Sequence, residues 1–139
     1  PKVDWVQILL DLPKADGEAN QMYNPDAPYD AMWSQHAPQQ SLQSMRDWCR
    51  DRGIRLGVVL WPFLQGLGPG EFYPFAKIHR EVASFCEKEG IPFLDLLPPL
   101  HAVVPTMDLW VTPADMHPNP RAQRLALPAL VGFVQRLGG

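Results

Sequence analysis

The segment Arg55-Leu-Gly-Val-Val-Leu-Trp61 decides the fold of this chain. It is an apolar run that ends at a proline, and such a run is typical of a β-strand buried on both faces. Two segments with apolar residues at helical spacing flank it, residues 41–52 before it and residues 74–89 after it. Gly53 and Gly90 follow these segments, at the left-handed position that often ends a helix. Helices are therefore expected to connect the central strand to its neighbours.

Apolar runs at residues 3–12 and 91–96 predict two further strands, and Asn119-Pro120 predicts the start of a last helix. The order strand–helix–strand–helix–strand–helix predicts an α/β fold in which right-handed crossovers join a parallel sheet. We expect one domain over residues 1–139. Three strands make a thin sheet, so one or more N-terminal strands are expected to precede Pro1. An open sheet edge would favour association with that N-terminal segment or with another subunit.

In a parallel sheet, ligands bind beyond the carboxyl ends of the strands. The loops expected there are residues 13–40, 62–73 and 97–117. The first is polar and rich in turn-forming residues, and a loop of more than ~15 residues in a compact domain is usually functional or mobile. Because it also carries Trp33 and other apolar side chains, we interpret residues 13–40 as a lid-like loop.

Composition excludes several classes of partner. The chain has 139 residues, of which 46% are hydrophobic and 19% charged, as expected for a soluble globular domain with one core. A net charge of −3 argues against nucleic acid or an anionic membrane as the main partner. Because no apolar run approaches ~18 residues, no membrane span is predicted.

The segment Asp115-Met-His117-Pro118-Asn119-Pro120, just before the last helix, carries the clearest chemical signal. A carboxylate bound to one imidazole nitrogen makes the other nitrogen the base and stabilises the imidazolium that forms. We therefore predict His117 as a general base and Asp115 as its orienting partner, both in a loop fixed by the helix N-terminus.

With these residues the chain resembles the SGNH, or GDSL-type, ester hydrolases and acyltransferases. The resemblance rests on Asp115–Asn119, on Leu109-Trp-Val111, on Gly90–Leu96 and on Arg52–Pro62, and it covers the chain as the C-terminal two-thirds of that domain. It implies a three-layer α/β/α, flavodoxin-like fold, and transfer of an acyl group from an ester through a serine acyl-enzyme. It implies no cofactor and no metal. The expected substrate is a small-molecule, glycan or lipid acyl ester.

The chain departs from that family at three points. The family separates its Asp and His by two residues, whereas here Met116 alone separates them and Ala114 takes the other position. No Gly-Asp-Ser turn is present, so the nucleophilic serine is expected from a segment outside these residues. Pro13-Lys14 stands where the family has an Asn-Asp pair, and proline cannot donate a hydrogen bond to an oxyanion. Asn20 and Asn24 are the candidates to replace that donor.

Other interpretations remain open. A non-catalytic α/β module could bind a carbohydrate, lipid or protein through its aromatic residues, and a flavodoxin-like nucleotide domain is a third possibility. A zinc site built from Asp115, His117 and His101 is conceivable. Aromatic side chains supply contact area with a polar handle. The candidate pocket residues of this kind are Trp33, Tyr73 and Trp110, whereas Trp61 is expected to pack in the core.

Two further residues have structural expectations. His79 lies in the middle of a predicted helix and is expected to be solvated. Asp95 ends the third predicted strand, and its side chain is expected to hold the following loop by hydrogen bonds.

Overall fold

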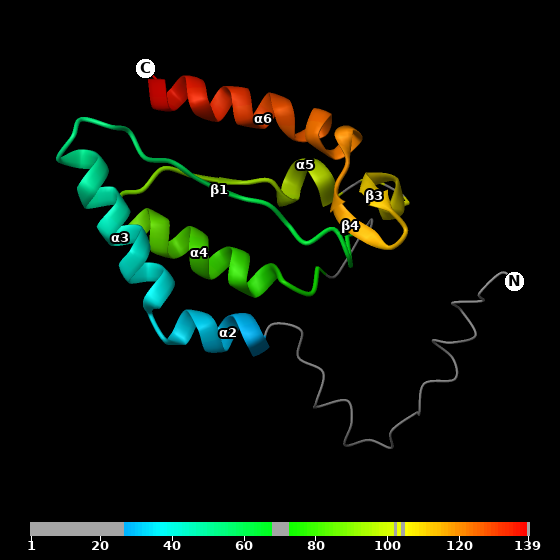
Figure 1. The fold of residues 1–139 in the computed structure, drawn as a ribbon, viewed down its shortest axis with the longest axis horizontal. Helices are drawn as coiled ribbons and strands as arrows, with labels where there is room; N and C mark the ends of the chain where they lie inside the picture. Colours follow the sequence, from blue (N-terminus) through cyan, green and yellow to red (C-terminus); the bar gives the residue numbers. More distant parts are fainter. Residues whose placement is uncertain (1–26, 68–72, 102, 104, 139) are drawn as a thin grey trace, which may run out of the picture.

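A computed structural model describes residues 27–67, 73–101, 103 and 105–138 (Figure 1). Over these residues helices and short strands alternate. In chain order the elements are α2 (Ala27–Ser34), α3 (Ala37–Arg50), β1 (Val58–Leu60), α4 (Ala76–Lys88), β2 (Phe93–Asp95), α5 (Leu97–His101), the 3-10 helix η2 (Thr106–Leu109), β3 (Trp110–Thr112), β4 (Asp115–Pro118) and α6 (Pro120–Gly138).

The predicted strand–helix–strand unit is confirmed. β1 and β2 pair in parallel, with Val58 opposite Phe93 and Leu60 opposite Asp95, and α4 connects them. Figure 1 shows α4 and α6 on opposite sides of this strand pair. The chain is thus a mixed α/β domain with a small parallel sheet. The predicted strand at residues 3–12 lies outside the described residues.

The core forms where α4, α5 and α6 pack around the strands. Its fully buried side chains include Cys86 from α4, Leu100 from α5 and Ala122 from α6. At the other end of α6, Phe133 and Leu137 lie against the backbone just before β1. A Cβ added at Gly57 would lie 2.6 Å from Leu137 Cδ1, which is too close. A glycine at this position therefore allows α6 to approach the sheet closely.

The prediction of a loop over residues 13–40 is wrong for the residues of that range that the structure describes. Residues 27–34 and 37–50 are helical, so α3 begins four residues before the predicted Ser41. The prolines in this stretch misled the prediction: Pro38 occupies the first turn of α3, where its missing N–H costs nothing and its fixed φ suits a helix. The rest of the expected lid, residues 13–26, lies outside the described residues.

The expected loop over residues 97–117 is also largely structured. It contains α5, η2 and β3, and β4 begins within it. Among the described residues, no helix is both long and apolar enough to cross a bilayer.

The close approach at Gly57 gives a stability prediction. Gly57→Ala should lower the free energy of unfolding by about 1–3 kcal/mol, because overpacking forces side chains out of position. Gly132→Ala is the matched control. Its added methyl group would lie 3.4 Å from Arg136 Nη1, an ordinary contact, and alanine favours a helix by about 1 kcal/mol over glycine. Urea denaturation measures both variants, and equal effects would contradict this packing.

Candidate functional site

His117 lies on a β-hairpin. β3 and β4 pair antiparallel, with Trp110 opposite Pro118 and Thr112 opposite Asp115. At the turn, the Thr112 hydroxyl oxygen accepts a hydrogen bond from the Ala114 N–H at 3.3 Å. The prediction that His117 sits in a loop is therefore wrong, and the histidine is instead held in the second strand of the hairpin.

Asp115 binds His117 twice through one carboxylate oxygen. Its Oδ1 lies 2.6 Å from His117 Nδ1 and accepts the His117 backbone N–H at 3.0 Å. Because an ionised carboxylate only accepts hydrogen bonds, the proton of the neutral imidazole belongs on Nδ1. The lone pair is then on Nε2. The spacing of one residue between Asp115 and His117 therefore suffices for contact, and Ala114 is not needed for it.

These hydrogen bonds also favour the ionised form of Asp115. The backbone N–H of His117, and then its ring, hold the pKa of the Asp115 carboxyl below its ordinary value. The carboxylate is therefore ionised throughout the neutral pH range.

Asn119 fixes the hairpin to the last helix. Its side-chain Oδ1 caps α6 by accepting the N–H groups of Arg121 at 2.8 Å and Ala122 at 3.1 Å. Its Nδ2 donates to the carbonyl oxygens of Asp108 at 2.8 Å and Trp110 at 2.9 Å. One side chain thus joins η2, β3 and the N-terminus of α6, two residues after His117.

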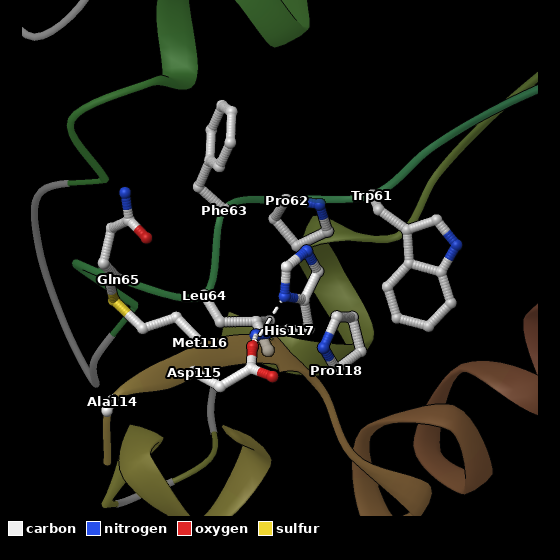
Figure 2. A pocket seen from close by; sticks show the side chains of 10 residues that line it. All are labelled: Trp61, Pro62, Phe63, Leu64, Gln65, Ala114, Asp115, Met116, His117 and Pro118. Carbon is white, nitrogen blue, oxygen red and sulfur yellow. Dashed lines mark hydrogen bonds and ion pairs between the residues drawn. The ribbon is translucent and has the colours of Figure 1, made fainter. Parts of the chain in front are cut away.

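An open groove of about 430 Å³ runs beside the imidazole. One wall is the segment that follows β1, and the other is the hairpin (Figure 2). Figure 2 shows the imidazole ring between these walls, with Asp115 below it and Pro62 above it. The groove thus lies at the carboxyl end of β1, where a ligand site is expected in a parallel sheet. Its described lining residues are Trp61, Pro62, Phe63, Leu64, Gln65, Ala114, Asp115, Met116, His117 and Pro118.

The dyad is accessible from solvent. The side chain of His117 is 86% exposed and that of Asp115 is 45% exposed. The imidazole is therefore free to exchange a proton with a group that enters the groove. None of the ten described lining residues is a serine, so the groove as described contains a histidine–carboxylate pair without a serine hydroxyl.

The structure does not bring the other predicted pocket residues into this groove. Trp33 lies on α2 and packs edge-on against Phe85, with 5.7 Å between the ring centroids. Tyr73 is buried, and its hydroxyl oxygen accepts the Phe63 N–H at 2.8 Å. Trp110 is half-buried against the core. None of these three aromatic residues lines the groove beside His117 as described, and their contact with a substrate stays a prediction.

Two of the remaining candidates lie outside the described residues, and one aromatic residue has a second role. Asn20 and Asn24 precede the described part of the chain. Trp61 packs against the core as expected, but it also lines the groove. β1 ends at Leu60, one residue before Trp61. Trp61 therefore lies at the carboxyl edge of the parallel sheet, where ligands are expected.

A second histidine–carboxylate pair escaped the sequence analysis. His79 was expected to be solvated, yet it is only 5% exposed. Its Nδ1 lies 3.0 Å from both carboxylate oxygens of Asp95. The sequence does carry a signal for this burial, because His79 is four residues after Phe75 and three before Val82, on the apolar face of α4. Asp95 Oδ1 also accepts the Leu97 N–H at 2.8 Å, which confirms its expected hold on the following segment.

A metal site receives no support from the geometry. Among the residues that the structure describes, no three His, Cys, Asp or Glu side chains gather as metal ligands would. In particular, His101 does not line the groove that contains Asp115 and His117.

Comparison with protein-family models, with curated proteins and with solved structures found no match.

Asn119 provides a stability prediction. Asn119→Ala should lower the free energy of unfolding by about 1–2 kcal/mol, because it removes an N-cap together with two amide donors. Asn119→Asp separates the two roles: it keeps the cap acceptor but places a carboxylate against two carbonyl oxygens. We expect the aspartate variant to disturb the amide resonances of residues 108–118 while α6 remains intact. If the hairpin resonances of the aspartate variant are identical to those of wild type, the Asn119 amide does not hold the Asp108 and Trp110 carbonyl groups.

The dyad provides a titration prediction. In ¹³C NMR, the pKa of the Asp115 carboxyl should lie below the ordinary aspartate value of about 3.9. His117→Ala should raise this pKa only part of the way, since the backbone N–H at position 117, the larger cause, remains. A return to the full ordinary value would contradict the two-contact geometry. Because the folded-state pKa is lowered, any stability that this carboxylate adds is present above about pH 4 and is lost as the pH falls below it.

Proposed function

We propose that this domain supplies the His–Asp half of an SGNH-type ester hydrolase or acyltransferase. The observation that carries the proposal is the 2.6 Å contact between Asp115 Oδ1 and His117 Nδ1, on an exposed ring that faces a groove. The finer fold, a flavodoxin-like three-layer sandwich, belongs to the same proposal. It is supported by the parallel β1–α4–β2 unit and by the helices on both sides of it.

The proposed mechanism needs a serine hydroxyl from a segment beyond these residues. His117 Nε2 takes the serine proton as the oxygen attacks the ester carbonyl carbon. A tetrahedral intermediate forms, and its collapse breaks the bond to the alcohol oxygen. His117 then returns the proton to the leaving alkoxide, which leaves an acyl-serine. Water hydrolyses this intermediate in a hydrolase, or a second alcohol accepts the acyl group in a transferase.

Asp115 acts on both proton transfers. Its hydrogen bond keeps Nε2 free to accept, and its negative charge stabilises the imidazolium between the two steps. The oxyanion that forms on the ester carbonyl needs hydrogen-bond donors, and the family provides one of them near the position of Pro13. Proline at position 13 cannot provide one through its backbone, and the loss of one such donor typically costs about 10²–10³ in rate.

The second candidate is a binding module without turnover. Its support is that the described groove has apolar walls and no nucleophile of its own. Trp33 does not line this groove and packs against Phe85 on α4, so a ligand bound by Trp33 would lie at another surface.

Covalent labelling by a fluorophosphonate separates the two candidates. We expect the full-length protein to be labelled at a serine, and His117→Asn to slow labelling by about 10²- to 10⁴-fold. His36→Asn is the matched control, because His36 is exposed between α2 and α3, at a left-handed backbone position that asparagine tolerates. Labelling at an equal rate in both variants, or no labelling at all, would contradict the hydrolase proposal.

A further inference from the structure

We propose that the buried pair of His79 and Asp95 positions the wall of the groove that borders His117. The pair acts through Tyr73, whose hydroxyl group holds the backbone of Phe63 in that wall. Where it concerns catalysis, this inference rests on the proposed function. Its structural part, the hold of a buried histidine on the groove wall, can be tested in a protein without any turnover.

The wall consists of residues 61–65, and it begins where β1 and β2 end. Leu60, the last residue of β1, lies opposite Asp95, the last residue of β2. The Leu96 N–H donates to the Leu60 carbonyl oxygen at 3.0 Å and joins the two strand ends. Asp95 therefore lies at the base of the wall, on the neighbouring strand.

From this place Asp95 fixes the orientation of His79. Both carboxylate oxygens lie 3.0 Å from His79 Nδ1, and Oδ1 also accepts the Leu97 N–H at 2.8 Å. Because a carboxylate accepts hydrogen bonds, the ring nitrogen that faces it is the donor. The histidine is only 5% exposed. A buried imidazole with one nitrogen bound in this way has little freedom to rotate.

The imidazole in turn packs against Tyr73. The two ring centroids are 5.3 Å apart with the planes at 90°, which is the edge-to-face geometry that aromatic rings favour. The Tyr73 hydroxyl oxygen accepts the Phe63 N–H at 2.8 Å. The Phe63 ring lies 4.9 Å from that of Phe75, and Figure 2 shows it turned away from Met116. Phe63 thus anchors the wall to the aromatic core and does not face the hairpin.

This anchor matters for the site because the residue beside it borders the base. Figure 2 shows Pro62 next to the imidazole of His117, on the side away from Asp115. A shift of the Phe63 backbone would move Pro62, and with it the space through which a hydroxyl group reaches Nε2. A displacement of about 1 Å can cost about 10²-fold in rate. His79 does not line the groove, so it is a positioning residue.

Amide hydrogen exchange measured by NMR tests the hold on Phe63. Tyr73→Phe keeps the ring and removes the hydroxyl group, so the Phe63 N–H should exchange about 2- to 10-fold faster, as expected for the loss of one hydrogen bond. His79→Asn keeps a donor for Asp95 but removes the ring that packs against Tyr73. We expect a rise of the same kind at Phe63 in this variant.

The exchange rate of Phe63 is compared with that of Val58, whose N–H donates to the Pro92 carbonyl oxygen at 2.8 Å at the other end of β1. A general loss of stability would speed both amides, whereas loss of the anchor raises the Phe63 rate relative to the Val58 rate. Val82→Ala is the matched control, because it removes buried atoms from α4 and no side-chain hydrogen bond. It should leave the ratio of the two rates unchanged.

A double variant identifies the path. In the Tyr73→Phe background, His79→Asn should raise the ratio no further, because His79 reaches Phe63 through the Tyr73 hydroxyl group. If His79→Asn does not fold, His79→Leu replaces it, since leucine suits the apolar face of α4. An unchanged ratio in the single histidine variant, or additive effects in the double variant, would overturn the inference.

Fluorophosphonate labelling of the full-length protein provides the catalytic arm. Tyr73→Phe and His79→Asn should lower the maximal labelling rate several-fold and leave the half-saturating reagent concentration nearly unchanged, because the pair positions the base and does not bind the reagent. Val82→Ala should change neither quantity. Labelling of both variants at the wild-type rate would overturn the link to His117.

The two arms separate the inference from the proposed function. If the wild-type protein is not labelled but the exchange ratio responds as expected, the proposed chemistry is wrong and the hold of His79 on the wall stands. If the wild-type protein is labelled and the exchange ratio does not respond, the positioning role is wrong and the chemistry stands.

Discussion

The candidate site depends on the side chain of Asn119, which connects the hairpin to the last helix. Its carbonyl oxygen caps α6, and its amide nitrogen holds two carbonyl groups from η2 and β3. α6 is in turn held against the sheet, where Gly57 leaves room for Phe133. The hairpin that carries His117 therefore has its position set by the core, even though the imidazole itself is exposed. An exposed base on a fixed support can be both accessible and oriented, as acid–base catalysis requires.

Periodicity and capping residues predicted the parts of the fold that depend on local sequence. The parallel pair β1–β2, the connecting helix α4 and the cap at Asn119 all follow from such patterns. The contact between Asp115 and His117 was expected from their closeness in the sequence, whereas the strand that puts both side chains on one side was not predicted. Prolines were the main source of error: those before α3 were taken as marks of a loop, although Pro38 lies in the first turn of that helix.

Long-range packing could not be predicted from local patterns. His79 lies on an apolar helix face, which indicates burial, but its pairing with Asp95 at the end of β2 depends on packing between distant segments. Trp33 and Tyr73 were assigned to a pocket because aromatic side chains suit ligands. The structure uses them to pack helices and to hold Phe63. Aromatic residues serve cores and pockets alike, so their type alone does not separate the two.

We propose that His117 Nε2 is oriented to take a proton from a serine that a further segment brings to the groove. A crystal structure of the full-length protein tests it most directly. We expect a serine Oγ about 2.6–3.2 Å from His117 Nε2, with Asp115 still bound to Nδ1. A structure in which a chain segment fills the groove and places no hydroxyl group within reach of Nε2 would contradict it.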